Sequence, residues 1–342
     1  MQRKQVIGIL VNRNSGEAYA GLKIKHDFNL IYFNPEDINW RRRTIRGLYR
    51  TKYGLHYKSM PIPLVIYNRL YPHDSETIKQ LMSLRPPVQV FNQITQLDKW
   101  IIYKELVETE LEPYLPRTYE YDMAGLHEAL ADHQQVVLKP RIGRQGAGIW
   151  RLTVKPANQL KIEHELPLPI LLPYSEAMMK LLHILMIPYT MIIQEYIDLA
   201  KADGASFDIR ALVQKNRCGD WEVTAITSRV AEKNHYITNI YEKILLTSQL
   251  LSEYDYPTNK ILACVEDLSI TAAEKLEKAL GHLGEISVDI GLDQSCKPWI
   301  IEVNGKPDKL LYGELDNPDL LQKVQTTPLE YASFLGSKKR RL

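Results

Sequence analysis

The sequence predicts an α/β protein made of two mixed, α+β-like lobes, because short buried-strand patterns and helical patterns alternate from about residue 136 onward. The stretch 261–283 has helical apolar spacing and is predicted to end at Gly284. Strands that follow one another directly argue against a doubly wound Rossmann domain. The runs that read as strands are 136–138, 191–196, 209–214, 221–227, 286–290 and 299–303, with a hairpin turn at 216–220.

Composition and charge narrow the class of protein. The chain has 342 residues, 45% of them hydrophobic and 25% charged, which is ordinary for a globular protein with two or three packed units. A net charge of +2 predicts no nucleic-acid partner, and no apolar run is long enough to predict membrane insertion. Three scattered cysteines (Cys218, Cys264 and Cys296) predict packed thiols and no zinc or disulfide framework. Without a visible signal segment, the expected location is the cytoplasm.

Two strand patterns, 6–11 and 64–67, mark an N-terminal domain over residues 1–95. A second domain is predicted over 96–335; it opens with a helix at 98–110 that Pro113 and Pro116 end, and a basic tail over 336–342 follows it. The roles of two segments are not decided by the sequence. The apolar, proline-rich stretch 156–188 is packed core and loop or, less favoured, part of a substrate pocket. The basic segment is a solvated surface or a site for phosphate or an acidic partner; it contains Arg41, Arg42, Arg43, Arg46 and Arg50.

The first candidate site is a strand-end lysine followed by a glycine-rich loop. Lys139 ends the strand pattern, and Gly143, Gly146 and Gly148 follow it. Glycines let backbone N–H groups approach phosphate oxygens, to which a lysine adds a positive charge. The lysine precedes the glycines, so the loop is not a Walker A motif. An ordinary flexible hairpin loop would have the same pattern. Arg141 and Arg144 in the loop hold phosphate or an anionic substrate, or are simply solvated.

The second candidate is a group of oxygen-bearing side chains on two neighbouring strands. Strand alternation places Asp289 on the face of its strand that is opposite the apolar face. On the following strand, Glu302 and Asn304 share one face, and Ile301 and Val303 share the other, which is predicted to face the core. A turn-like segment at 293–298 predicts an antiparallel hairpin that sets Asp289 across from Glu302. Facing carboxylates repel unless a cation lies between them, and hard oxygen ligands suit Mg²⁺. The alternative is a solvent-facing polar surface.

The third candidate is a nucleotide-binding connector. Apolar residues lead into Glu195, Tyr196 and Ile197, whose backbone and carboxylate are suited to the edge of an adenine base. Asp208 is placed to accept from a ribose hydroxyl, and Arg229 to neutralise phosphate. Taken singly, these residues are more often structural: Glu195 as a surface acid, and Asp208 with Arg210 as a strand ion pair.

In this order the motifs resemble the ATP-grasp superfamily over about residues 95–310, and within it the YheC/YheD family of endospore coat-associated proteins. The subgroup likeness is carried by Ile66-Tyr67-Asn68-Arg69-Leu70, Asp98-Lys99-Trp100, Phe207-Asp208-Ile209-Arg210 and Glu302-Val303-Asn304-Gly305-Lys306-Pro307. The resemblance implies an ATP-grasp fold of two lobes that clamp ATP, with a small pre-grasp domain over 1–95 that helps bind the acyl substrate.

The resemblance also implies roles for single residues. Lys139 would hold the α- and β-phosphates under the three glycines, and Lys99 would contact phosphate as well. Arg229 would face the γ-phosphate. Asp289, Glu302 and Asn304 would hold Mg²⁺, with Glu302 bridging two ions.

The activity implied is a carboxylate–amine or carboxylate–thiol ligase that uses ATP through an acylphosphate. The substrates would be small molecules or peptides. Two alternatives stay open: an ATP-binding coat or assembly protein with little turnover, in contact with spore coat proteins, and a kinase that stops at phosphoryl transfer.

Overall fold

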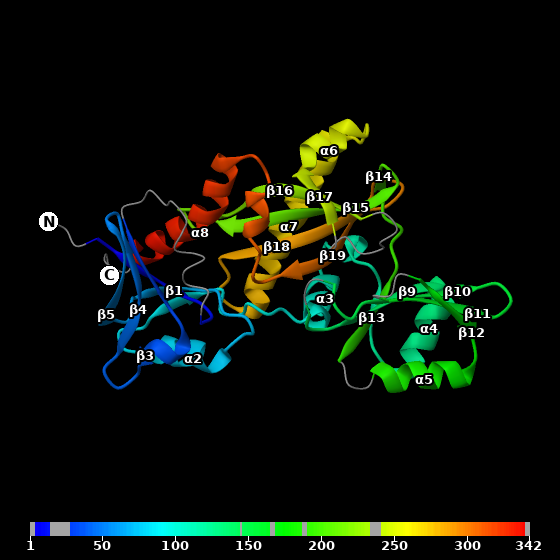
Figure 1. The fold of residues 1–342 in the computed structure, drawn as a ribbon, viewed down its shortest axis with the longest axis horizontal. Helices are drawn as coiled ribbons and strands as arrows, with labels where there is room; N and C mark the ends of the chain where they lie inside the picture. The colour runs from blue at the N-terminus through cyan, green and yellow to red at the C-terminus, as the bar shows by residue number, and fades with distance from the viewer. Residues whose placement is uncertain are drawn as a thin grey trace.

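The computed structural model describes residues 4–13, 28–143, 146–164, 168–186, 190–232 and 241–338. Three β-sheets follow one another along the molecule, each with helices packed against it (Figure 1). The N-terminal sheet lies at one end, a small lobe at the other, and a large lobe between them. This is the mixed α/β architecture that the sequence predicts. No helix among the described residues is long and apolar enough to cross a membrane.

The N-terminal sheet has the strand order β3-β4-β2-β1-β6-β7, with β5 paired to β4. Strands β1, β2, β6 and β7 are parallel, and parallel sheets are normally buried on both faces, so other elements must pack on each face of this sheet. Ile7 and Ile9 point to one face and pack with Leu329 of α8, whereas Ile66 on the other face packs with Leu81 of α2. The elements are β1 (Val6–Leu10), β2 (Asn29–Phe33), η1 (Pro35–Asp37), β3 (Ile38–Asn39), β4 (Thr44–Thr51), β5 (Gly54–Pro61), β6 (Val65–Asn68), α2 (Ser75–Ser83) and β7 (Gln89–Phe91).

The small lobe is an antiparallel sheet in the order β12-β11-β10-β9-β13-β8. Two helices supply the apolar side chains that fill one core with this sheet, among them Leu126, Met179 and Leu182. Of the described residues within 156–188, Leu160 and Met179 belong to this core, whereas Leu171 and Leu185 are exposed. The elements are β8 (Thr118–Glu120), α4 (Met123–His133), β9 (Gln135–Pro140), β10 (Trp150–Lys155), β11 (Gln159–Glu163), β12 (Ile170–Pro173), α5 (Glu176–Met186) and β13 (Met191–Glu195).

The large lobe carries the main sheet in the order β17-β16-β15-β18-β19, with β14 paired to β15. Helix α7 packs on one face through Val265, Leu268 and Ala272, and the other face carries polar side chains beside a smaller apolar cluster that includes Leu212. The elements are α3 (Lys99–Val107), η2 (Glu112–Tyr114), β14 (Lys201–Ala202), β15 (Ala205–Lys215), β16 (Trp221–Ala231), β17 (Tyr241–Leu246), α6 (Thr247–Glu253), α7 (Thr258–Leu280), β18 (Glu285–Leu292), β19 (Pro298–Asn304), η3 (Leu310–Gly313) and α8 (Pro318–Lys338).

Three predicted boundaries shift. Helix α7 ends at Leu280, not at the predicted Gly284, because Gly281 adopts a φ of +95° at the C-cap, a value that disfavours residues with a Cβ. Helix α3 ends at Val107, before either proline. Helix α8 continues to Lys338, so the predicted tail starts inside a helix, and residues 339–342 lie outside the described residues.

The C-terminal helix α8 joins the predicted domains. Leu329 and Ala332 lie in the core of the N-terminal sheet, while Val324 of the same helix packs with Leu212 of β15. The last helix of the chain therefore fixes the N-terminal sheet against the large lobe and forms one wall beside the polar face of the main sheet.

Candidate functional site

The polar face of β18 is the base of the site. All eight residues of this strand are buried, yet Glu285, Ser287 and Asp289 alternate along it, opposite the core residues Val288 and Ile290. Buried polar groups require partners, so this pattern demands a polar layer above the sheet.

Asp289 lies directly across from Glu302 in the antiparallel pair β18–β19, which confirms the predicted hairpin register. The Asn304 Nδ2 lies 3.4 Å from Asp289 Oδ2. The three oxygen-bearing side chains thus come together from adjacent strands, as the alternation predicts.

Two arginines on neighbouring strands compensate the charge of Asp289. Arg210, its register partner on β15, donates from Nε and Nη2 at 2.7 Å each. The Arg229 Nη2 lies 3.3 Å from Asp289 Oδ2. Burial alone would raise the pKa of Asp289, but the two guanidinium groups outweigh it and lower the pKa. The predicted repulsion between Asp289 and Glu302 is therefore relieved by cations of the protein itself.

The same register changes the ion pair considered for Asp208. Asp208 lies opposite Arg229 and accepts from its Nε at 3.0 Å, whereas Arg210 turns to Asp289. The expected Asp208–Arg210 pair is thus replaced by two cross-strand pairs. Asp208 is 3% exposed and does not line either large cavity described below, so its present contacts orient Arg229.

A β-bulge corrects one prediction on β19. The ladder shifts between Asp289 and Ile290, so that Ile290 pairs with Ile300 and Ile301 becomes the extra residue. Ile300, not Ile301, joins Val303 in the core. The carbonyl of Ile301 is turned toward the small lobe, where Lys139 Nζ donates to it at 3.2 Å.

Two lysines meet Glu302 where the lobes face each other. Lys139, near the end of β9, donates to Gln194 Oε1 at 2.7 Å, and burial lowers its pKa to about 8 against the opposing attraction of Glu302. Lys99, the first residue of α3, places its Nζ 3.1 Å from Glu302 Oε1. The two lysines and Glu302 line one cavity of only 30 Å³. The two predicted phosphate-binding lysines are therefore neighbours in space although 40 residues apart in the chain.

The glycine loop joins β9 to β10. Gly146 and Gly148 have φ values of +74° and +73°, so the backbone adopts the left-handed conformation that glycine favours. Gly143 lines the larger cavity described below. Arg141 does not face that cavity as a free cation: it binds Asp98, the N-cap of α3, at 2.7 Å, and Glu120 at 2.9 Å. The suggestion that Arg141 holds phosphate is thus disfavoured, and Arg144 lies outside the described residues.

The predicted connector borders a shallow groove of 370 Å³. Glu195 ends β13, accepts from the backbone N–H of Arg117 at 3.1 Å and lines the groove. Tyr196 and Ile197 line it as well, with Trp299 of β19 opposite. The guanidinium of Arg151 lies 4.8 Å from the ring centroid of Tyr196. The connector therefore lies at a surface that is open to a ligand.

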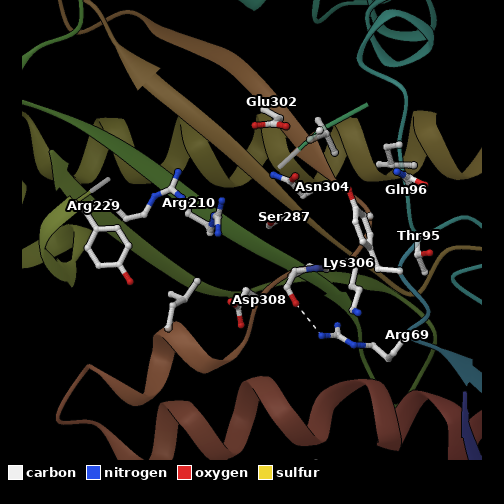
Figure 2. Close-up of a pocket in the computed structure, with 18 residues that line it drawn as sticks. Arg69, Thr95, Gln96, Arg210, Arg229, Ser287, Glu302, Asn304, Lys306 and Asp308 are labelled. Atoms are coloured by element: carbon white, nitrogen blue, oxygen red, sulfur yellow. Dashed lines mark hydrogen bonds between the residues drawn. The ribbon is translucent and has the colours of Figure 1, made fainter. Parts of the chain in front are cut away.

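A cavity of 380 Å³ lies over the polar face of the main sheet. Figure 2 shows Ser287 and Asn304 near its centre, Arg210 and Arg229 on one side, and Lys306 and Arg69 on the other. The Ser287 hydroxyl is buried without a hydrogen-bond partner among the described residues. Sequence reasoning placed Arg229 and Asn304 in a site but did not place Arg69, Arg210, Ser287 or Lys306 there; for Ser287 the signal was its alternation with Asp289. The labelled lining is Arg69, Thr95, Gln96, Arg210, Arg229, Ser287, Glu302, Asn304, Lys306 and Asp308.

The N-terminal domain closes this cavity. Arg69 at the end of β6 donates from Nη2 to the carbonyl of Pro307 at 2.9 Å, and from Nη1 to buried Glu285 at 2.5 Å. Lys309 also binds Glu285, at 2.6 Å. The two sequence segments around Arg69 and Pro307 are thus tied together, and the loop after Asn304 is held in place.

The donor set suits a hard divalent cation. Two carboxylates and one amide oxygen on one face match the chemistry of Mg²⁺, which completes its shell with water and phosphate. Asp289 and Glu302 are at present neutralised by Arg210 and Lys99. Among the described residues no cluster of three or more His, Cys, Asp or Glu side chains forms a metal site, so the asparagine would be needed as third ligand.

Residues 87–335 match the family described as YheC/D like ATP-grasp. The chain belongs to this family. It is 30% identical over 329 residues to the endospore coat-associated protein YheD of Bacillus subtilis (strain 168), an alignment that covers 90% of this chain and 70% of YheD.

The architecture is that of solved ATP-grasp enzymes. N5-carboxyaminoimidazole synthetase from Staphylococcus aureus, complexed with ADP, superposes with a TM-score of 0.58 at 11% identity, covering 94% of this chain and 76% of that one. VanG D-Ala:D-Ser ligase from Enterococcus faecalis gives a TM-score of 0.55 at 14% identity, with 96% and 100% coverage. At such identities the likeness establishes the fold alone.

Proposed function

We propose that this ATP-grasp protein is an ATP- and Mg²⁺-dependent ligase that couples a carboxylate to an amine or thiol through an acylphosphate. The observation that carries the proposal is the convergence at the lobe junction. Lys139 of the small lobe reaches the strand that carries Glu302, and Glu302 faces Asp289 across the ladder. Cations that bind phosphates and oxygens that bind a metal are thus adjacent, which is what phosphoryl transfer needs.

ATP would lie between the lobes. Glu195 and the backbone of Tyr196 and Ile197 meet the adenine at the groove they line. Asp208 as a ribose contact stays a prediction, since a ribose hydroxyl would compete with Arg229 for its oxygens.

The phosphates would lie at the lobe junction. Lys99 and Lys139 exchange their present partners for the α- and β-phosphates, beneath Gly143, Gly146 and Gly148. Arg229, in the wall of the 380 Å³ cavity, faces the γ-phosphate.

Mg²⁺ would be held by Asp289, Glu302 and Asn304, with Glu302 bridging two ions. The metal would neutralise charge on the transferring phosphoryl group. Arg210 donates to Asp289 from Nε and Nη2 and would orient that carboxylate toward the metal.

The acyl substrate would occupy the 380 Å³ cavity, whose lining comes from both the N-terminal domain and the large lobe. Closure of the glycine loop would exclude water, which otherwise hydrolyses an acylphosphate. The polar lining, with four Arg or Lys side chains against Glu302 and Asp308, favours a charged or strongly polar substrate over an apolar one.

Nucleotide binding is the first test. In a thermal-shift titration with ATP and Mg²⁺, the melting temperature of the wild type should rise, because a ligand that binds only the native state stabilises it. Lys139→Ala should bind ATP at least tenfold more weakly with little change in fold, since burial of the charged lysine is itself unfavourable. Lys155→Ala, on the same lobe and exposed, is the matched control.

Absence of any shift at millimolar ATP would refute nucleotide binding. If ATP binds, pairs of carboxylates and amines are screened for ADP release with a coupled product. ADP release without a coupled product would instead indicate a kinase.

A second candidate is an ATP-binding assembly protein of the spore coat with little turnover. The name of YheD as endospore coat-associated favours it. ATP binding without ADP release across the screen, together with recovery of the protein in coat extracts of a sporulating cell, would support this role over the ligase.

A further inference from the structure

The β4–β5 hairpin concentrates positive charge that the net charge of the whole chain conceals. Between residues 38 and 73 there is no Asp or Glu. The hairpin and the turn before it carry seven basic side chains: Arg41, Arg42, Arg43, Arg46, Arg50, Lys52 and Lys58. A net charge of +2 for 342 residues therefore hides a strongly basic surface.

The hairpin forms the outer edge of the N-terminal sheet. Among the described strands β5 pairs only with β4, and seven of its eight residues are exposed, on both faces of the strand. Figure 1 places it at the end of the molecule opposite to the small lobe, far from the lobe junction. A ligand bound there would not compete for the nucleotide cleft.

Aromatic rings are interleaved with the charges. Tyr53 and Tyr57 are 87% and 65% exposed. The Arg46 guanidinium lies 5.9 Å from the centroid of the Tyr57 ring, and Lys52 Nζ lies 4.8 Å from that of Tyr53. Tyr57 pairs with Leu48, so its side chain shares a face with Arg46 and Arg50, whereas Lys58 Nζ lies 4.5 Å from the centroid of the Tyr49 ring on the opposite face.

Protection of a sheet edge does not account for this composition. Charged side chains on an edge strand prevent pairing with other chains, but exposed aromatic rings and β-prone residues promote it. Charges of both signs would serve protection equally well, whereas these are of one sign. Guanidinium groups bind phosphates in bidentate geometry, and exposed aromatic rings stack on unpaired bases.

We infer that the β4–β5 hairpin binds single-stranded nucleic acid around its β5 edge. Phosphates would lie on Arg46 and Arg50 of one face, on Lys58 of the other face and on Lys52 at the turn, with bases stacked on Tyr53 and Tyr57. This replaces the expectation, drawn from net charge, that no nucleic acid is bound. Contact with about four phosphates gives a slope of log K against log salt of about −3, because each contact with a single strand contributes roughly 0.7. Affinity should then fall about 50-fold between 50 and 200 mM NaCl.

The test is fluorescence anisotropy of the full chain with a labelled 20-nucleotide poly(dT) or poly(rU), in saturating Mg²⁺-ADP. Arg46→Glu/Arg50→Glu should weaken binding at least tenfold, and Tyr57→Ala about fivefold or more through lost stacking. Arg217→Glu/Lys260→Glu makes the same charge change at exposed positions of the large lobe and should bind like the wild type. Circular dichroism checks that each variant is folded.

Three results would overturn the inference. The first is no binding by the wild type at 50 mM NaCl up to 100 µM protein, a concentration on the order of the weakest non-specific dissociation constants. The second is an equal loss of binding in the Arg217→Glu/Lys260→Glu control, and the third is binding of polyphosphate or poly-glutamate as tight as that of the oligonucleotide, with the affinity of Tyr57→Ala unchanged. The last result would identify a general polyanion surface without base stacking. Because the experiment uses no turnover, its outcome is independent of the proposed ligase activity.

Discussion

Strand β18 carries two buried carboxylates four residues apart, Glu285 and Asp289, and they serve different purposes. Glu285 lies at the junction of the N-terminal sheet and the large lobe and accepts from Arg69, Lys309, Tyr67 and Gln214. Asp289 is bound by Arg210 and Arg229, yet faces Glu302 and Asn304 near the cavity. Burial and pairing alone therefore do not distinguish a structural charge from a candidate ligand; the neighbouring Glu302 and Asn304, which line the cavity, do.

The two sites also differ in how their charges are balanced. Burial alone would raise the pKa of Glu285, but Lys309 and Arg69 outweigh it and lower the pKa to about 2. At the lobe junction, Lys99 and Glu302 are only partly buried, so their ion pair can be exchanged for ligands. We expect mutations in the first cluster to change stability and mutations in the second to change activity.

The largest effect is expected from Glu285→Gln. It leaves Arg69 and Lys309 buried without a counter-charge, which costs about 3–5 kcal/mol in the free energy of unfolding. Urea denaturation measures this loss, while the ATP affinity of the folded fraction should change less than about twofold.

The pH dependence of the free energy of unfolding provides a control for the Glu285→Gln experiment. Because the folded pKa of Glu285 is lowered from 4.5 to about 2, its contribution to stability is complete above pH 4.5 and is lost as pH falls toward 2. The variant should lack that part of the acid transition. A variant as stable as wild type would show that the cluster is not the structural element described.

The next effect is expected from Glu302→Gln. Turnover with Mg²⁺ should fall about 100-fold or more, because the variant lacks a proposed ligand of the Mg²⁺ that would neutralise the transferring phosphoryl group. Since the ion pair with Lys99 is partly exposed, stability should change by less than about 1 kcal/mol. ADP release and urea denaturation report the two quantities. Unchanged turnover would show that Glu302 is not a metal ligand, and the contrast with Glu285 would then no longer hold.

The smallest effect concerns Lys139 and pH. Burial lowers the pKa of Lys139 to about 8, whereas a bound phosphate would favour the charged form, so ATP binding at this site should take up a proton above that pH. The dissociation constant for ATP should therefore rise about tenfold between pH 7 and pH 9. Lys139→Arg stays charged throughout and should give a flat profile by calorimetry. Parallel profiles in the two proteins would show that Lys139 does not carry the binding charge.

The sequence by itself determined the local patterns and their order. Alternation in 286–290 and 299–303, with a turn between them, was enough to predict that Asp289 faces Glu302. Glycine spacing located the loop after Lys139, and the motif order led to the family that residues 87–335 match. These features depend on neighbours in sequence, where the periods of helix and strand are fixed by backbone geometry.

Only the tertiary structure decided which groups meet across the chain. The bulge that turns the Ile301 carbonyl to Lys139, the exchange of partners between Asp208 and Arg210, and the contact of Arg69 with Pro307 each depend on packing between distant segments. The same holds for the cavity around Ser287 and for the exposure of both faces of β5. Ladder register and burial are set by the summed packing of the whole molecule, and no single segment encodes them.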